Sequence, residues 1–220
     1  MSDLQPTQLL EQQLFSDVIR ERRSVRNYDP AVKISREELT EILQEATLAP
    51  SSANLQPWRF LVIDSPELQQ KLLPIAFNQQ QVVEASAIIA ILGDLENIKL
   101  AEKIYGQAVD AGFMPEQTAS SFIERYTNMF ASMPQEAIRQ IVNVDCGLVS
   151  MQLMNIARAK GYDTVPMGGY DKGKFVEAFG ISDRYTPVML IAIGKAATPG
   201  RPTTRLPIED VTFFNEIPQE

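Results

Sequence analysis

The strongest helix signal in the sequence covers residues 134–160, and it constrains the fold more than any other segment. Gly161 follows it and suits the end of a helix. At about 1.5 Å per residue, such a helix would be roughly 40 Å long. Residues 144–154 carry apolar and small side chains on several faces, so we expect burial all round. The chain has 220 residues, enough for one full domain or two small ones with a substantial core.

Two apolar runs indicate strands that are buried on both faces. They are residues 87–93 (AIIAILG) and 188–194 (VMLIAIG). Shorter strands are predicted at 59–64 and 162–166, and helices at 9–22, 35–48, from 65 onward, 95–112, 115–133 and 172–179. Helices mixed with a few buried strands predict a single α+β domain over residues 1–220, ending in an irregular, Pro-rich segment at 196–220.

The composition excludes several kinds of chemistry. The chain has no histidine, which rules out Ser-His-Asp and Cys-His catalysis and removes the commonest metal ligand. Its single cysteine, Cys146, can form neither an internal disulfide nor a thiolate zinc cluster, so we predict no metal site. The net charge of −8 argues against general nucleic-acid binding. Any demanding chemistry is therefore expected to come from an organic cofactor.

The ends and the apolar runs of the chain bear on its location. The N-terminus has neither the basic start nor the apolar block of a signal peptide. The most apolar run, residues 85–92, is far too short to span a bilayer. We therefore expect a cytoplasmic protein without a membrane partner.

Four arginines, Arg20, Arg22, Arg23 and Arg26, lie within seven positions around Ser24. Arginine forks match phosphate oxygens with paired hydrogen bonds, and a serine hydroxyl adds a donor. The pattern fits a phosphate-binding site where a helix passes into a loop. The alternative is a solvated helix end, where cations meet the C-terminal dipole favourably. The sequence has no Walker-type loop and no G-x-G-x-x-G to decide between them.

Three further segments could carry chemistry. PSSANLQPW at 50–58 gathers Ser, Asn and Gln in a Pro-bounded loop, which suits the edge of a polar heteroaromatic ring or a well-capped connector. VPMGGY at 165–170 has two glycines that permit close backbone approach, or form a plain turn. Gly194-Lys195 and then RPTTRLP at 201–207 place cations on an extended tail, which could also be a solubilising terminus.

Together and in this order, the segments resemble the nitroreductase family of FMN-dependent enzymes. The matching pieces are RRSVRNY, PSSANLQPW, FN at Phe77-Asn78, GYDTVPMGGYD, and GK followed by TTRLP. The resemblance implies a central mixed sheet flanked by helices, in an intertwined homodimer. The 134–160 helix then forms the buried dimer core, and residues 196–220 form a C-terminal arm that reaches the partner. The flavin is expected at the dimer interface.

The resemblance also implies a role for individual residues. Arg22 and Ser24 match contacts to the FMN phosphate and ribityl chain, and Arg205 matches a phosphate contact from the tail. Arg26 and Asn78 match contacts at the flavin pyrimidine end, where positive charge would stabilise the reduced, anionic flavin.

Further positions complete the implied site. Ser51, Ser52 and Asn54 match contacts that the second subunit supplies. The backbone of Gly168 and Gly169 matches the chain beside flavin N5, so no catalytic side chain is predicted. The full predicted cofactor-binding set is Arg22, Arg23, Ser24, Arg26, Ser51, Ser52, Asn54, Gln56, Asn78, Pro166, Met167, Gly168, Gly169, Lys195 and Arg205.

Three positions depart from the family pattern or lack a role. Many relatives have an acidic residue in place of Gly168, so only its backbone role carries over. Thr203 stands where some relatives have lysine, and Arg23 has no matching ligand role.

The implied activity is a ping-pong reaction. Hydride passes from NADH or NADPH to flavin N5, and then to an electron-poor small molecule such as a nitroaromatic, a quinone or another flavin. The alternatives are a reductase of activated C=C bonds with the same fold, a flavin-binding or redox-sensing protein without fast turnover, and an unliganded interaction protein. The motifs specify neither the acceptor nor the choice between NADH and NADPH.

Overall fold

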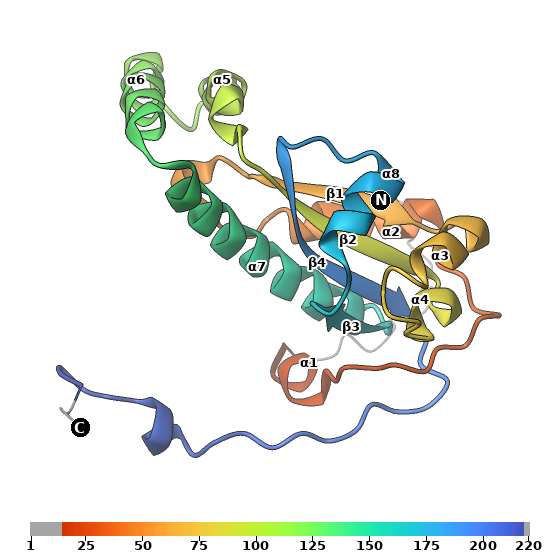
Figure 1. Cartoon of the computed structure of the whole chain (residues 1–220). Coiled ribbons are helices and arrows are strands. Elements are labelled where there is room, and N and C mark those ends of the chain that lie inside the picture. Colours follow the sequence, from red (N-terminus) through yellow and green to blue (C-terminus); the bar gives the residue numbers. More distant parts are fainter. Residues whose placement is uncertain (1–14, 218–220) are drawn as a thin grey trace, which may run out of the picture.

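The computed structural model describes residues 15–217, and a four-stranded sheet lies at its centre (Figure 1). The strands are β1 (Trp58–Ile63), β2 (Ala87–Asp94), β3 (Asp163–Met167) and β4 (Tyr185–Gly194), in the spatial order β1-β2-β4-β3. All three neighbouring pairs are antiparallel, so the expectation of a mixed sheet is wrong for these strands. β2 and β3 run in the same direction, but β4 lies between them. The α+β class is confirmed.

Helices flank this sheet. The structure contains α1 (Phe15–Glu21), α2 (Arg36–Ala46), α3 (Pro66–Leu72), α4 (Gln81–Glu84), α5 (Ala101–Asp110), α6 (Glu116–Ser132), α7 (Gln135–Ala159) and α8 (Lys172–Phe179), with 3-10 turns η1 (Ser52–Asn54), η2 (Asn97–Leu100) and η3 (Ile208–Val211). The predicted helices and strands are confirmed with shifted boundaries, except that residues 9–14 of the first helix lie outside the described residues. The short α4 was not predicted. Within residues 15–217, no helix is long and apolar enough to cross a membrane.

The ends of the helices follow the chemistry of the flanking residues. Ser35 Oγ accepts the Glu38 N–H at 3.1 Å and so caps α2. Pro66 occupies the first turn of α3, where a missing N–H costs nothing. Past the end of α7, Gly161 takes a φ of 81°, a conformation that favours glycine.

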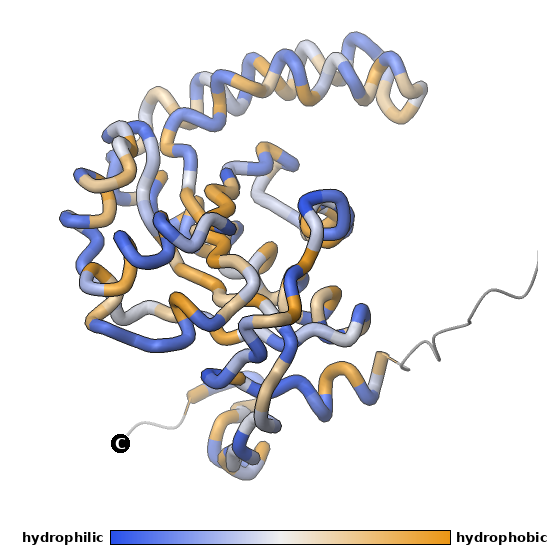
Figure 2. Tube along the Cα trace, turned by 90° about the vertical axis from the view of Figure 1, so that its right-hand side faces the viewer, coloured by the Kyte–Doolittle hydropathy of each residue, from blue (hydrophilic) through white to orange (hydrophobic). Residues whose placement is uncertain are grey.

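Burial on both faces explains the apolar composition of β2, in which every residue is buried. Ile89 and Ile91 pack with α2 and α7 on one face of the sheet. Ile88 and Ala90 pack with α3, α4 and α8 on the other face. Figure 2 shows hydrophobic residues concentrated in the middle of the molecule, where the strands lie. The alternation of side chains along a strand thus requires helices on both sides.

The long helix α7 is buried on one face only within this chain. Its sheet-facing residues include Cys146, Val149 and Leu153, which are inaccessible to solvent. On the opposite face, Val144 is 64% exposed and Leu148 is 43% exposed. That face contributes to an apolar pocket of about 640 Å³ between α7, α1 and the end of α2. The expected burial all round is therefore not achieved by one copy of the chain.

Two parts of the chain extend away from the sheet (Figure 1). Helices α5 and α6 pack on each other, and the rings of Tyr105, Phe122 and Tyr126 form a contiguous aromatic cluster between them. The tail after β4 is extended and almost wholly exposed up to residue 217. Its exposed apolar side chains are Leu206, Ile208, Val211, Phe213, Phe214 and Ile217.

A substitution at Gly93 tests how tightly α7 packs on the sheet, and one at Gly106 is its control. A Cβ on Gly93 in β2 would lie 2.3 Å from Val142 Cγ1 of α7, so Gly93→Ala is expected to lower the free energy of unfolding by about 1–3 kcal/mol. Gly106 in α5 has open space around it, so Gly106→Ala is expected to raise stability by about 0.5–1 kcal/mol. Urea unfolding measures both. Equal effects of the two changes would contradict the close packing of α7 on β2.

Candidate functional site

Arg22 lies at the centre of a cationic cluster at the end of α1. Its backbone N–H donates to the Val18 carbonyl at 3.0 Å, while its buried Nε has no partner among the described residues. Burial lowers the pKa of Arg22, and the charges of Arg205 and Arg23 lower it further. The structure thus brings a tail arginine close enough to act electrostatically on one that follows the first helix. Like charges this close repel, and an oxyanion between them would relieve the repulsion.

Ser24 is held beside this cluster by the start of β3. It forms a parallel bridge with Thr164, whose buried hydroxyl has no partner in the described chain. Lys195 Nζ donates to the Gly161 carbonyl at 2.8 Å and so ties the end of β4 to the chain entering β3. Unsatisfied polar groups in a folded protein call for an explanation, and a bound ligand is one.

Arg23 and Arg26 differ from Arg22 in their surroundings. Arg23 Nη1 donates to the carbonyls of Arg20 and Arg22, which satisfies the C-terminal end of α1. Gly200 of the tail packs directly on it, since a Cβ there would lie 2.4 Å from Arg23 Cβ. These contacts account for Arg23 without a ligand. Arg26 is exposed.

An ion-pair cluster that the sequence analysis missed adjoins Arg23. Arg158, near the end of α7, pairs with Glu21 at 3.1 Å and with Asp163 at 3.2 Å. It joins α1, α7 and β3 around a pocket of about 550 Å³, which the first residues of the tail also line. A lone arginine in the last turn of a helix gave no signal of these partners.

The two glycines after β3 form an open stretch of backbone. Gly168 and Gly169 are exposed, and a Cβ on either would meet no heavy atom within 4 Å. Neither has a positive φ, so nothing inside the chain requires glycine there. Close approach of another molecule remains as the physical reason. Met167 is buried in the core and Pro166 lies in β3, so Met167 can offer a ligand only its backbone.

Asn78 lies next to these glycines. Gln79 Nε2 donates to the Gly169 carbonyl at 2.8 Å, and Asp171 N–H donates to the Ile75 carbonyl at 2.9 Å. Phe77 and Asn78 both have left-handed backbones, with φ values of 55° and 57°. The structure therefore unites the predicted 77–78 and 168–169 segments, and it adds Gln79, which the motif comparison passed over.

The 50–57 loop is strained and firmly anchored. Ala53, Asn54 and Gln56 have φ values of 52°, 54° and 45°. Such conformations cost about 1–3 kcal/mol each and concentrate at functional sites. Ser51 Oγ accepts the Gln56 N–H at 3.0 Å, and the Tyr105 hydroxyl donates to the Ala53 carbonyl at 2.7 Å. Surrounding contacts therefore maintain an unfavourable backbone.

Asp145 of α7 is a buried anchor of the same loop that the sequence analysis missed. Its carboxylate accepts hydrogen bonds from the backbone N–H and the hydroxyl of Ser52, at 3.0–3.1 Å. Burial raises the pKa of Asp145, and the Ser52 hydrogen bonds offset this only in part. The Ser52 hydroxyl is thus already engaged within the chain.

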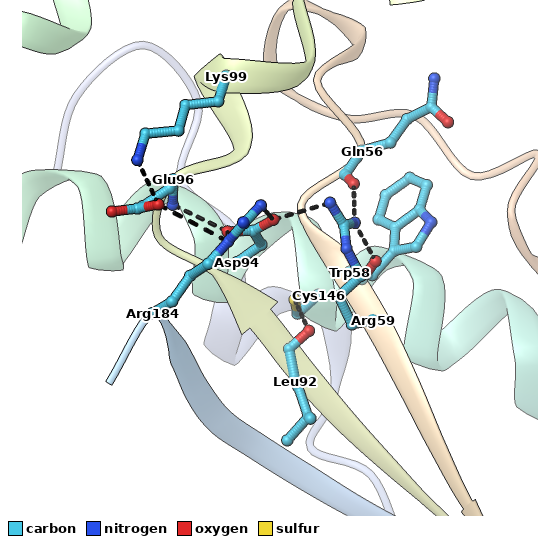
Figure 3. Close-up of polar contacts among 9 residues, drawn as sticks. All are labelled: Gln56, Trp58, Arg59, Leu92, Asp94, Glu96, Lys99, Cys146 and Arg184. Atoms are coloured by element: carbon cyan, nitrogen blue, oxygen red, sulfur yellow. Dashed lines mark hydrogen bonds and ion pairs between the residues drawn. The ribbon is translucent and has the colours of Figure 1, made fainter. Parts of the chain in front are cut away.

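A second acid, Asp94 at the end of β2, fixes the far side of the loop (Figure 3). Its side chain has no exposed surface and accepts from Arg59 at 2.8 Å and from Arg184 at 2.7 and 2.8 Å. Its N–H donates to the Pro57 carbonyl at 2.8 Å. Burial raises the pKa of Asp94, but the hydrogen bonds from Arg184 and Glu96 N–H and the two arginine charges lower it more, so the net shift is downward.

The predicted site residues fall at two ends of one sheet. Trp58, where the 50–57 loop enters β1, lies opposite Gly93, which pairs with Thr186 near the start of β4. Asp163, beside the arginine cluster, pairs with Gly194 at the end of β4. Eight residues of strand separate Thr186 from Gly194, or about 26 Å. One chain therefore unites Arg22, Ser24, Lys195 and Arg205, but it does not bring the 50–57 loop to them.

The chain matches the model of the Nitroreductase family over residues 19–195. It is 55% identical over 199 residues to a protein of Bacillus subtilis (strain 168) named "Putative NAD(P)H nitroreductase YdgI", covering 90% of this chain and 95% of that one. It is 37% identical over 203 residues to the CLA biosynthesis enone reductase of Lactiplantibacillus plantarum, covering 91% and 94% of the two chains.

Solved structures agree with this match. A crystal structure of an Exiguobacterium sibiricum protein in complex with FMN superimposes with a TM-score of 0.90 at 52% identity, covering 92% of this chain and 98% of that one. The CLA enone reductase structure has a TM-score of 0.84 at 35% identity, covering 93% and 99%.

The opposite pKa shifts of the two buried acids predict opposite pH dependence. The lowered pKa of Asp94 contributes stability above its unfolded pKa, and this is lost as the pH falls through its folded pKa. The raised pKa of Asp145 contributes stability at low pH, and this is lost as the pH rises through its folded pKa. Relative to the unchanged protein, Asp94→Asn should therefore lose stability as the pH rises toward about 4, the ordinary pKa of an unfolded Asp, and Asp145→Asn should gain stability as the pH rises above about 4. At pH 7, Asp94→Asn should be less stable by about 3 kcal/mol, because it leaves two arginines without their carboxylate. Urea unfolding at several pH values measures both trends, and parallel trends would contradict the assignment.

Proposed function

The chain belongs to the nitroreductase family, a family of oxidoreductases, and on that premise we propose an FMN-dependent NAD(P)H oxidoreductase. A bound FMN would supply the redox chemistry, in which hydride from NADH or NADPH would pass through N5 to an electron-poor acceptor, such as a nitroaromatic, a quinone or another flavin, in a ping-pong cycle. One observation carries the proposal: the unsatisfied, buried Nε of Arg22 beside the like charge of Arg205.

The phosphate would be held by Arg22, Arg205 and Ser24. Two guanidinium groups and a hydroxyl are the donor set that phosphate oxygens favour. The orphaned hydroxyl of Thr164 lies on the same bridge as Ser24 and adds a donor. A bound phosphate would offset the repulsion between the two arginines.

The reacting end of the flavin would lie along the open backbone at Gly168 and Gly169. Their unobstructed surface allows a planar ring to approach the main chain, whose N–H groups can donate to ring nitrogens. Asn78 lies at the same place and can satisfy the polar pyrimidine edge, while the amide of Gln79 is already engaged with the Ala76 and Gly169 carbonyls and with Gln81. Here the protein would need only to orient the reactants, so a chain without histidine suffices.

We propose a homodimer in which each site uses both copies. The 50–57 loop is about 26 Å of strand away from the arginine cluster of its own chain. A second copy packed on the exposed face of α7 could supply its loop, with Ser51, Asn54 and Gln56, to the first copy's flavin. The same packing would bury Val144 and Leu148, and the apolar tail could lie along the partner.

A second candidate activity is the reduction of activated C=C bonds. It is favoured by the 37% identity to an enone reductase. The same flavin site would serve both reactions, so the acceptor distinguishes them.

The visible spectrum of purified protein, taken before and after anaerobic addition of NADH or NADPH, tests the shared step. Steady-state assays with nitroaromatic, quinone and enone acceptors then rank the activities. Protein that carries flavin but is not bleached by either nucleotide would refute the reductase.

The phosphate contacts can be tested by removing both arginines. Arg22→Ala with Arg205→Ala is expected to weaken FMN binding about a hundredfold or more, because each contact of a charged group contributes about 1.5–3 kcal/mol. Titration of apoprotein with FMN, followed by flavin fluorescence, measures the change. Arg201→Ala is the matched control, an exposed tail arginine that should leave the affinity unchanged. Unchanged affinity in the double variant would contradict the assignment.

The dimer can be tested by placing charge on α7. Leu148→Glu is expected to shift the protein to monomers and to lose bound FMN, since a buried carboxylate without a partner is costly. Leu68→Glu on α3 is the control, because Leu68 is 39% exposed, close to the 43% of Leu148, and lies on the other side of the sheet. Light scattering after size-exclusion chromatography gives the mass of each. A Leu148→Glu variant that remains dimeric and yellow would exclude this interface.

A further inference from the structure

A separate polar pocket of about 450 Å³ lies behind the 50–57 loop. It is bounded by the start of β1, the chain entering β4, and one face of η2 and α5. Its lining residues are Gln56, Trp58, Arg59, Leu100, Lys103, Ile104, Gln107 and Arg184. It includes three cations, and the described residues that line it include no acid.

Two of these cations are rigidly placed. Asp94 lies buried behind the pocket and holds the guanidinium groups of both Arg59 and Arg184, as Figure 3 shows. Arg59 also donates to the Gln56 carbonyl at 3.0 Å and to the Trp58 carbonyl at 2.6 Å. Fixed guanidinium groups lose little entropy when they bind a ligand.

The local charge is not balanced. Asp94 neutralises one arginine charge, and Glu96 pairs with Lys99 at 2.6 Å and lies 3.9 Å from Arg184. Lys103 has no hydrogen-bond or ion-pair partner in residues 15–217, and neither does Nη1 of Arg184. Positive charge and free donors thus meet in a hollow, in a chain whose net charge is −8.

The remaining walls are neutral. Trp58, Leu100 and Ile104 offer apolar surface, and Gln107 adds an amide. A ligand that suits this lining carries one anionic group toward the cations and a small apolar body against the indole and the aliphatic side chains.

We propose that this pocket is a binding site for a small organic carboxylate, with Lys103 and Arg184 as the contacts to the carboxylate and Trp58 beside its apolar body. The site is additional to the flavin site and does not depend on it. It borders the 50–57 loop through Gln56, whose carbonyl Arg59 holds.

The chain offers a direct probe, because Trp58 is its one tryptophan. We would titrate the protein as purified with sodium benzoate at low ionic strength, follow Trp58 fluorescence, and confirm binding by calorimetry. Saturable binding is expected, with benzamide binding at least about fivefold more weakly because it lacks the charge. Equal binding of benzoate and benzamide, or no saturable binding by either method, would overturn the proposal.

Two lysines provide the matched comparison. Lys103→Met removes the free cation of the pocket and is expected to weaken benzoate binding about fivefold. Lys174→Met on α8 removes a lysine that is paired with Asp171 and does not line the pocket, and it should change the affinity little. Neither change touches the Arg59–Asp94–Arg184 cluster, so both variants should fold. Equal losses in both variants would indicate general charge attraction and refute the site.

Discussion

Burial of β2 on both faces is the constraint on which the rest of the structure depends. Every side chain of this strand needs an apolar neighbour, and alternate residues face opposite sides. The chain must therefore place α2 and α7 on one side and α3, α4 and α8 on the other. That layered core holds the ends of the strands rigidly, and the candidate site residues lie just beyond those ends.

The rigid core offsets unfavourable features at its edges. The left-handed residues among 53–56 and at 77–78, the unsatisfied Nε of Arg22 and the repulsion between Arg22 and Arg205 all oppose folding. Nearly all of them fall in segments that the family resemblance assigns to the cofactor. Strain and unmet polar groups are expected where a ligand completes a site, so their location supports the proposed function.

The length of the sheet explains why one copy of the chain is incomplete. The arginine cluster and the 50–57 loop lie at opposite ends of β4. In addition, α7 exposes an apolar face that no other part of the described chain covers. A homodimer would resolve both features at once. Asp94 lies at the end of the sheet where the 50–57 loop enters β1. It binds this loop through the Pro57 carbonyl and holds Arg59 of the cationic pocket.

What the sequence determined by itself is the set of elements and the order of the motifs. Residues 87–93, 134–160 and 172–179 were predictable because burial leaves a local pattern of apolar residues, whereas the four-residue α4 is too short to leave one. Only the tertiary structure decided which distant groups meet. Three interactions each join residues far apart in the chain: the repulsion between Arg22 and Arg205, the Ser52–Asp145 anchor and the Arg59–Asp94–Arg184 cluster. Nothing in local spacing encodes such pairs. The prediction of a mixed sheet was wrong for the same reason. The place of β4 between β2 and β3 is a property of the packing and not of any one strand.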